Sequence, residues 1–292
     1  MSEIGSLAFS VTRTEFLGLP FTSLATIADA ALVLKQASRS REWRYVVTPN
    51  AAHLARLSRS DQVLLRIYAN ASFCFLDSQV IRLVARAVGI RAPSVITGAD
   101  LVEHLFRREI TASTSICVIG GDDAAMAQLR GRFSFGKLDH LNPSAGFWHN
   151  EKELERIVRF IVASAADYTF LAVGSPQQEF LAACVAASGE GRGVGICAGA
   201  SIDFLTGAQR RAPRFMRRAG LEWAYRLCSE PRRLAHRYLV ESPTGVLLVL
   251  RFGLHATRFV SRANVPVCQA PCLPTPSRGR APDRFAGAKT SE

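Results

Sequence analysis

The sequence contains no long uninterrupted hydrophobic run and comparatively few acidic residues. Its longest apolar candidate, GVLLVL at 245–250, ends at Arg251 and falls short of the ~18 residues that a membrane-spanning helix needs. The first residues, MSEIGSLAFSVTRTEFLGLPF, lack the basic start and long apolar stretch of a secretory signal, so we expect no signal peptide. Asp and Glu number 24 against 36 Lys and Arg, a net charge of +12. That balance indicates an anionic partner, namely nucleic acid, a membrane surface or a phosphate-bearing substrate.

Several common chemical motifs are also missing. The seven cysteines include no CxxC pair, and most lie in apolar segments. This predicts small buried residues in a reducing cytosol and argues against a disulfide scaffold. The six histidines show no metal-ligand spacing. VIGGDD at 118–123 is half of a nucleotide loop without the GxGxxG spacing, so a nicotinamide-binding site is disfavoured.

The chain does have a globular composition with an uneven charge. Hydrophobic residues make up 48% and charged residues 21%, which is enough core material for one large domain or two smaller ones. The segment 209–262 carries twelve arginines, no lysine and three acidic residues, a net charge of +9. Arginine binds phosphate through two parallel hydrogen bonds. We predict a core over 1–205, a basic amphipathic appendage over 206–262 and a disordered Pro-, Gly-, Ala- and Ser-rich tail over 263–292.

Strand and helix signals alternate through the predicted core. Short apolar runs that indicate buried strands lie at 44–50, 73–77, 114–121, 167–174 and 193–199, with helical patterns between them. Gly89 is placed to end one helix, and Asn150 with Glu153 resembles a capping box at the start of another. The alternation predicts the α/β class, with a mostly parallel Rossmann-like sheet and helices on both faces.

Polar residues follow several of these strands. In AVGSPQQEFLAA at 172–183 an apolar strand stops at a small-residue turn, and Pro176 suits the first turn of the next helix. In open α/β sheets ligands bind at the carboxyl ends of the strands, so we expect a pocket at this edge. Its candidate residues are Thr48, Asn50, Asp77, Gly120, Gly121, Gln178, Glu179 and Asp203.

Each candidate also has a purely structural interpretation. Spacing alone makes Asp77 a helix N-cap more often than a catalytic base. Residues 48–50 fit a turn and a cap, and Gln178 and Glu179 fit ordinary first-turn positions, where acids favour the helix dipole. An arginine-rich segment is usually a solvated face. Two other functions are open at this point: a nucleotide-binding oxidoreductase, and a non-enzymatic basic protein that binds nucleic acid, although no recognition motif for nucleic acid is present.

The order of the motifs is more specific than any one of them. Between Val46 and Tyr238 the chain reads VVTPNAAHL, FLDSQVIRLVARAVG, ITGADLVEHL, VIGG, GFW, VGSPQQE and GASIDFLTGAQRRAPRFMRRAGLEWAYRLCSEPRRLAHRY. In this order the motifs resemble the WecG/TagA/CpsF family of glycosyltransferases, over about two thirds of the chain. Members of that family move a sugar, with inversion, from a UDP-sugar to a polyprenyl-diphosphate-linked saccharide at the inner face of the bacterial membrane. They build teichoic acid linkers, capsules and other exopolysaccharides.

The resemblance implies roles for matching residues. One carboxylate, that of Asp77, takes the position of the catalytic base. The residues that match the family's donor site are Thr48, Asn50, Thr97, Gly98, Gln178 and Glu179. Asp203 matches the acidic residue near the nucleotide. The basic residues that grip the acceptor's diphosphate match Arg226 and Arg233, with His236 or Arg237 after them.

The same resemblance implies neither a cofactor nor a metal. An inverting transfer needs one base, and a diphosphate leaves with little or no protonation. Metal-dependent transferases commonly carry a DxD motif, which this chain lacks in a plausible place. Helix N-termini and appendage arginines are expected to supply the positive charge instead. The expected partners are a UDP-sugar, a polyprenyl-diphosphate-linked saccharide and an anionic membrane surface, and not nucleic acid. The oligomeric state, a homo-oligomer included, stays open.

The resemblance also implies a place in the cell. We expect a cytoplasmic protein that is peripheral on the inner face of the cytoplasmic membrane. Trp223, Tyr225 and Tyr238 are expected at the interface, and GVLLVL at 245–250 is expected to dip into the leaflet.

Three departures from the family's pattern bear on the donor sugar. Ser78 follows the proposed base where glycine is common, Gln177 stands where lysine or arginine is common, and Val95 stands where arginine is frequent. The last two remove positive charge near the donor and argue against an acidic sugar. N-acetylmannosamine, its uronate and glucose all stay open.

Overall fold

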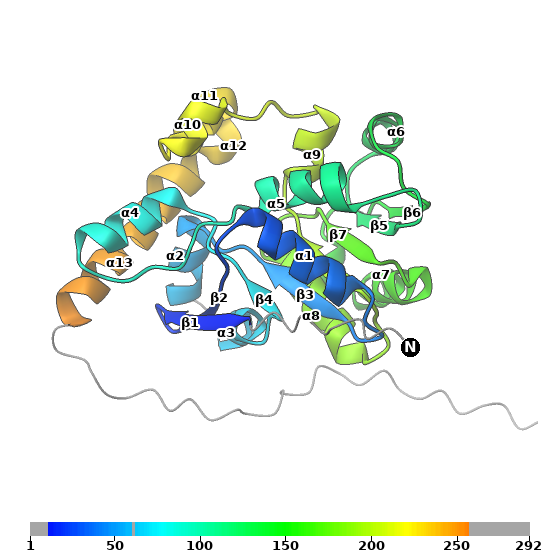
Figure 1. The fold of residues 1–292 in the computed structure, drawn as a ribbon, viewed down its shortest axis with the longest axis horizontal. Coiled ribbons are helices and arrows are strands. Elements are labelled where there is room, and N and C mark those ends of the chain that lie inside the picture. Colours follow the sequence, from blue (N-terminus) through cyan, green and yellow to red (C-terminus); the bar gives the residue numbers. More distant parts are fainter. Residues whose placement is uncertain (1–10, 60–61, 257–292) are drawn as a thin grey trace, which may run out of the picture. The chain divides into compact units, whose positions relative to one another are not determined.

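A computed structural model of the chain describes residues 11–59 and 62–256. Its centre is a six-stranded, entirely parallel sheet in the order β4-β3-β8-β7-β5-β6 (Figure 1). The strands are β3 (Arg44–Val47), β4 (Phe73–Cys74), β5 (Ser115–Ile119), β6 (Lys137–Leu141), β7 (Tyr168–Leu171) and β8 (Val194–Cys197). The predicted parallel α/β sheet is therefore confirmed. The tail at 263–292, predicted to be disordered, lies outside the described residues.

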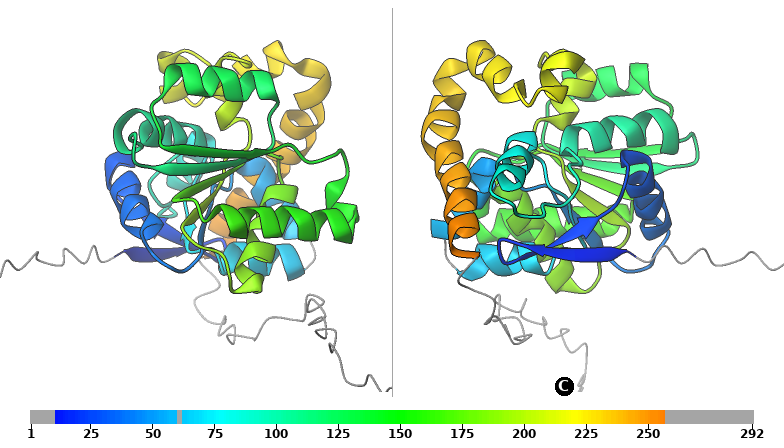
Figure 2. Two further views of the ribbon diagram at one scale, coloured as in Figure 1. Left: turned by 90° about the vertical axis from the view of Figure 1, so that its right-hand side faces the viewer. Right: turned by 60° about the vertical axis from the view of Figure 1, so that its left-hand side comes forward.

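Helices cover both faces of the sheet (Figure 2). The first face carries α1 (Ile27–Ser38), α5 (Gly98–His104), the π-helical turn η1 (Leu105–Glu109), α6 (Asp123–Arg132) and α9 (Ser201–Thr206). The second carries α2 (Ala51–Arg59), α3 (Gln62–Ala69), α4 (Gln79–Ala87), α7 (Glu151–Ser164) and α8 (Gln177–Ser188). The strands other than the edge strand β6 are mostly apolar because they bury side chains on both faces.

Successive residues of a central strand show this double burial. In β3, Tyr45 and Val47 pack against the second face, whereas Val46 packs against the first. A period of two residues sends neighbouring side chains to opposite faces of a strand. Two separate apolar cores follow, one on each side of the sheet. Cys74, Cys117 and Cys197 are buried in them as predicted, whereas Cys228 is exposed, against the prediction.

Local capping signals were mostly correct. Gly89 follows α4 with a φ of +73°, the left-handed conformation that glycine adopts without strain. Asn150 caps α7, its side chain accepting a bond from the amide of Glu153. The Glu153 carboxylate, however, binds the amide and hydroxyl of Ser144 at 3.0 and 2.6 Å. It therefore ties the preceding loop to the helix and does not complete a capping box.

Some elements carry no clear sequence signal. Strand β6 reads KLDHL and lies at the sheet's edge, where one side needs no apolar lining. A separate antiparallel hairpin, β1 (Thr12–Phe16) and β2 (Leu19–Ser23), contributes Phe16, Leu19 and Phe21 to the second core. A 3₁₀ turn, η2 (Phe147–His149), precedes α7.

The basic segment after α9 forms a run of helices that crosses one end of the core and returns along its side (Figure 1). These are α10 (Arg214–Arg218), α11 (Glu222–Ser229), α12 (Pro231–His236), the π-helical turn η3 (Arg237–Glu241) and α13 (Ser242–Ala256). Pro213 precedes α10 and Pro231 begins α12, as expected of helix-starting prolines. Pro243 does not break the chain as predicted, because it lies in the first turn of α13, directly after η3.

Helix α13 packs against the core on α2 and α4. Val249 is fully buried, and a Cβ on Gly245 would meet the carbonyl of Ala51, so the two backbones are in close contact. The expectation that 245–250 dips into a membrane leaflet does not match this position; within it, only Leu247 is an exposed large apolar side chain. No helix among the described residues is long and apolar enough to cross a membrane.

Candidate active site

A cavity of about 1430 Å³ lies at the carboxyl ends of β3, β4, β7 and β8. The turns after these strands form its floor, α5 and α9 form one wall, and α11, α12, η3 and α13 form its roof and opposite wall. Of the predicted site residues, ten line this cavity: Thr48, Asn50, Asp77, Thr97, Gly98, Gln178, Asp203, Arg226, Arg233 and Arg237. Glu179 does not, and His236 points outward, so Arg237 is the one of that pair that faces the cavity.

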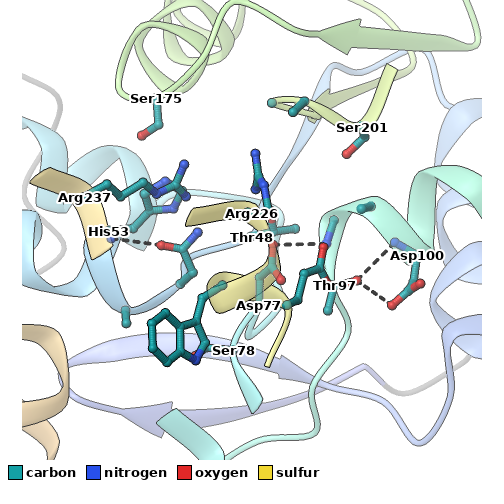
Figure 3. A pocket seen from close by; sticks show the side chains of 18 of the residues that line it. Thr48, His53, Asp77, Ser78, Thr97, Asp100, Ser175, Ser201, Arg226 and Arg237 are labelled. Atoms are coloured by element: carbon teal, nitrogen blue, oxygen red, sulfur yellow. Dashed lines mark hydrogen bonds between the residues drawn. The ribbon is translucent and has the colours of Figure 1, made fainter. Parts of the chain in front are cut away.

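Asp77 follows β4 and lies in the cavity (Figure 3). Its amide donates to the carbonyl of Pro49, which holds the end of β4 beside the end of β3. Its Oδ2 accepts a bond from the amide of Gly98 at 3.4 Å. Asp77 is not a cap: Ser78 is the N-cap of α4, and its Oγ accepts the bond from the amide of Ile81 at 3.2 Å. The carboxylate is therefore free for chemistry.

The electrostatics of Asp77 suit a base near neutral pH. Burial first, and then the negative charges of Glu222 and Asp100, raise the pKa of its carboxyl to about 7. The amide of Gly98 and the charge of Arg211 act in the opposite direction but do not offset these effects. A carboxylate with a pKa near the working pH can both take and hold a proton, as general base catalysis requires.

The residues in the turn after β3 have mainly structural roles. Asn50 caps α2, its Oδ1 accepting bonds from the amides of Ala52 and His53 at 3.1 and 3.3 Å. Thr48 is buried against α5, where a Cβ on Gly98 would meet its Oγ1 at 2.8 Å. Gly98 is thus needed for close approach of the two elements. The turn-and-cap interpretation of 48–50 is confirmed, and both side chains still border the cavity.

Gln178 and Glu179 act as a buried pair. The Gln178 Oε1 accepts a bond from the amide of Gly199 at 2.9 Å, and its Nε2 donates to the Glu179 Oε1 at 3.0 Å. The Tyr68 hydroxyl donates to the same oxygen at 3.1 Å. Burial raises the pKa of the Glu179 carboxyl. Glu179 therefore holds the amide of Gln178 from behind and, unlike Gln178, has no surface on the cavity.

Asp203 lies in the first turn of α9, where two arginines approach it. Burial raises the pKa of its carboxyl, whereas the positive charges of Arg233 and Arg226 lower it. The Arg226 guanidinium lies over the ring of Phe204, 5.3 Å from its centroid. Arg233 forms an ion pair with Glu230, in the same helical segment. The appendage thus brings positive charge to the carboxyl end of β8.

Ion pairs join the appendage to the core beside Asp77. Asp100 of α5 contacts Arg217 at 2.6 Å and Arg211 at 2.8 Å. Arg211 also contacts Glu103 at 3.1 Å and Glu222 at 3.8 Å. The Asp100 amide donates the cap bond to Thr97 Oγ1 at the start of α5, and the Asp100 carboxylate accepts a bond from the same hydroxyl. The ion pairs of Asp100 therefore hold the helix whose first amide reaches Asp77.

The glycines after β5 belong to a different hollow. Gly120 and Gly121 line a depression of about 250 Å³ together with residues 142–148 and Gln177. The ring nitrogen of His140 lies 3.3 and 3.2 Å from their carbonyl oxygens. The expectation that these glycines join Thr48 and Asp77 in one pocket is therefore wrong. The strand between them, β7, separates the two sites, which share only Ala172 and Val173.

Sequence reasoning missed several cavity residues. His53 and Arg56 face inward from α2, and Ser175 from the turn after β7. In the sequence, His53 and Arg56 are indicated only by their position, one and two helical turns after the candidate Asn50. The described residues contain no group of three His, Cys, Asp or Glu placed to hold a metal ion. The positive side chains around the cavity match an anionic ligand.

A comparison with protein families agrees with this geometry. The family model described as Glycosyl transferase WecG/TagA/CpsF family matches residues 14–258. That span includes every residue of the cavity, from the hairpin's neighbour α1 to α13. It also sets aside the oxidoreductase and the nucleic-acid-binding protein. The match covers most of the chain, so the protein belongs to the WecG/TagA/CpsF family of glycosyltransferases, which use a nucleotide-sugar donor and a saccharide acceptor in the synthesis of cell-surface glycans.

Proposed function

We propose that this glycosyltransferase moves a sugar, with inversion, from a UDP-sugar to a polyprenyl-diphosphate-linked saccharide at the inner face of the bacterial membrane. The observation that carries this proposal is the pairing of one carboxylate of pKa about 7, that of Asp77, with a roof of arginines over the same cavity. An inverting transfer between two diphosphate-bearing substrates needs one base and much positive charge.

The chemical step uses Asp77 as the base. Its carboxylate takes the proton of an acceptor hydroxyl while the hydroxyl oxygen forms a bond to the anomeric carbon of the donor. The bond from that carbon to the diphosphate oxygen breaks on the opposite side, and UDP leaves with the electron pair. Arg226, Arg233 and Arg237 supply positive charge to the two diphosphates that meet in the cavity.

The donor is held on the floor of the cavity. Thr48, Asn50 and Gln178 present polar groups around the sugar, and the first turn of α5, at Thr97 and Gly98, closes it. Asp203 lies on the nucleotide side at the start of α9. Glu179 contributes indirectly by holding the Gln178 amide. The sugar is N-acetylmannosamine, its uronate, glucose or a related hexose.

The membrane surface is the second partner that the appendage fits. Large apolar side chains are exposed on its helices, among them Phe215 at 71% and Leu239 at 62%. Leu221 of the turn before α11 and Phe252 of α13 are exposed as well. Exposed apolar groups among arginines favour binding to an anionic leaflet, because each basic residue near the leaflet contributes roughly 1 kcal/mol to the binding free energy.

The experiment that tests this function is a transfer assay. The full chain is incubated with a set of UDP-sugars and a short-chain polyprenyl-diphosphate saccharide, and the product is identified by mass. We expect one hexose to be added and UDP to be released. Transfer only from another class of nucleotide sugar, or only to an acceptor without a diphosphate, would contradict the proposal.

A further inference from the structure

Helix α4 of the core is flanked by appendage segments at both of its ends. Gly220, in the turn between α10 and α11, lies on its first turn, where a Cβ would meet the side chains of Gln79 and Val80 at 3.5 and 3.8 Å. Gly253 of α13 lies against its last residues, where a Cβ would meet Val88 at 2.6 Å. Figure 1 shows α4 beside α13 and below α10 and α11. A helix of the core therefore lies between two parts of the appendage.

The outward side of α4 combines basic and apolar side chains. Its buried residues, Ile81 and Ala85, are four positions apart and mark the side that packs against the core. Arg82, Leu83 and Arg86 are exposed, Leu83 to 56%. Successive residues of a helix are about 100° apart, so Leu83 lies opposite the two buried residues. The exposed side of α4 thus presents a leucine close to two arginines.

These arginines have no acidic partner. Within residues 11–59 and 62–256, neither Arg82 nor Arg86 forms an ion pair, and neither does the exposed Arg91 of the following loop. Residues 78–99 contain these three arginines and no acidic residue, whereas both arginines of α7 pair with glutamates of the same helix. Like charges four residues apart on a helix repel each other, and an anionic partner offsets that repulsion. The exposed side of α4 is therefore suited to an anion-bearing partner.

Exposed apolar side chains lie at both ends of this basic helix. Leu221 directly follows Gly220, and Phe252 directly precedes Gly253, and both are exposed. Together with Leu83, they come from three segments that are far apart in the sequence. A single exposed apolar residue needs no explanation, but several of them around unpaired arginines match the headgroup region of an anionic leaflet. There arginines meet lipid phosphates, and apolar side chains reach the boundary of the acyl chains.

The position of α4 beside the cavity gives this surface a role. The helix begins directly after Ser78, its N-cap, which itself follows Asp77, and residues 77–80 all line the cavity. Leu247 and Leu250 of the neighbouring α13 line it as well. A leaflet in contact with α4 would hold this part of the cavity next to the membrane, where a lipid-linked acceptor lies.

We propose that α4 is a membrane-binding element of the catalytic core. Arg82, Arg86 and Arg91 bind the phosphates of anionic headgroups, and Leu83 inserts between these headgroups. The assignment rests on the proposed function, and it adds a surface that belongs to the core and not to the appendage. Contact through both parts of the chain holds the enzyme in one orientation on the leaflet, because both sides of the cavity's rim are then fixed.

The test is co-sedimentation of the full chain with phosphatidylcholine vesicles, with and without an equal part of phosphatidylglycerol, which is anionic. We expect the parent chain to bind the anionic vesicles more tightly. Arg82→Gln with Arg86→Gln should weaken that binding by about fivefold for each arginine removed, the loss expected for a basic residue near an anionic surface. Leu83→Gln should weaken it by about threefold to tenfold, because apolar contact with the leaflet is lost.

Matched variants separate this surface from general effects. Arg156→Gln with Arg159→Gln removes the same two charges from the exposed side of α7, and Leu32→Gln changes an exposed leucine of α1. Neither should weaken vesicle binding appreciably. All variants should transfer sugar to a soluble short-chain acceptor at the parental rate, which shows that they are folded. Only the α4 variants should be slower with a long-chain acceptor embedded in anionic vesicles.

Four other outcomes are informative. Equal weakening by the α7 variant would reduce the effect to net charge and contradict the proposal. Loss of transfer to the soluble acceptor in Arg82→Gln with Arg86→Gln would place these arginines in the active site instead. If the parent binds no vesicles and Leu83→Gln dissociates a dimer in analytical ultracentrifugation, the surface is an interface between copies of this chain. If the vesicle results hold but the parent transfers sugar to neither acceptor, the proposed function is wrong and the membrane surface stands.

Discussion

The core contributes most of the carboxyl and amide groups of the cavity, and the appendage contributes most of its arginines. The core places carboxyl and amide groups there, each held by a hydrogen bond from a strand-end turn or a helix start, as Asp77 is by Gly98 and Gln178 by Gly199. The appendage places arginines there, and its helices expose large apolar side chains to solvent. The core is thus built for precise positioning of uncharged and acidic groups, and the appendage for binding anions and a surface. Their junction is ionic on one side, at Asp100, and apolar on the other, at Val249.

The largest effect is expected when the proposed catalytic base of the core, Asp77, is replaced. Asp77→Asn should lower turnover by ~10²–10⁴, because it removes the carboxylate proposed to take the acceptor proton. UDP affinity should stay unchanged in a binding titration. Ser78→Ala is the control: it removes the true cap of α4 and should cost ~1 kcal/mol of stability with most of the turnover kept. An Asp77→Asn enzyme with turnover within tenfold of the parent would show that the base lies elsewhere.

The proposed binding of the appendage to a membrane surface can be tested separately. Phe215→Ser with Leu239→Ser removes two of its most exposed apolar side chains. Partitioning onto anionic vesicles, measured by co-sedimentation, should fall by on the order of ten- to a hundredfold as that buried apolar area is lost. UDP binding should not change. Leu32→Ser on α1 of the core is a matched exposed leucine. If it reduces partitioning as much as Leu239→Ser alone, the appendage has no special affinity for the surface.

The ionic junction is expected to contribute a smaller effect. A double-mutant cycle of Asp100→Asn and Arg217→Gln, followed by urea unfolding, should give a coupling of roughly 1 kcal/mol, since the pair is close and partly buried. The exposed pair of Glu155 and Arg159 on α7 is the reference, with an expected coupling of ~0.3–0.5 kcal/mol. Equal coupling in the two cycles would mean that the junction is only another surface contact.

The negative charge of Glu222 on the appendage should also affect the titration of Asp77, the proposed catalytic base. Burial first and Glu222 second raise the pKa of Asp77 to about 7, and the reaction needs the deprotonated form. Activity should therefore fall as the pH drops through about 7. Glu222→Gln removes a negative charge, lowers this pKa and should move the acidic limb of kcat/KM to lower pH. Glu155→Gln removes the same charge far from the cavity. A limb that moves equally in both variants, or in neither, would show that Glu222 does not act on Asp77.

The smallest expected effect is that of chelation. If the appendage arginines supply the positive charge for the leaving diphosphate, as proposed, EDTA should leave the rate unchanged. Loss of activity that Mg²⁺ or Mn²⁺ restores would show that the arginines do not suffice for this task. The assay is the same transfer reaction, with the chelator added before the donor.

Local patterns were sufficient for much of the core. Apolar runs and cap residues predicted β3, β5, β7 and β8, because buried strands leave a run of apolar letters and helix starts need particular side chains. Parallel strands end at one edge, so Thr48, Asp77 and Asp203 were expected near one another, and all three line the cavity. Strand β6 was missed because an edge strand can be polar.

The roles of individual side chains depended on contacts between distant segments. Glu179 and Gln178 are neighbours in sequence, yet only Tyr68 and Gly199 determine which of them reaches the cavity. The GVLLVL run was predicted to dip into the leaflet, whereas in the structure it packs against α2. An apolar helix face has the same letters whether lipid or protein covers it, so hydropathy cannot distinguish the two.

Periodicity, capping chemistry and motif order thus determined the fold class and the family, because each motif depends on neighbours within a few residues and the order of motifs can be followed along the chain. The tertiary structure alone decided that Ser78, and not Asp77, caps α4 and that Asp77 has a pKa of about 7, since burial and the charge of Glu222 come from segments far along the chain. It likewise decided that Arg237 lies near His53, where its charge adds to the effect of burial in lowering the pKa of the imidazole. Electrostatic energy depends on distance in space and on exclusion of water, and neither quantity is written in the order of the residues.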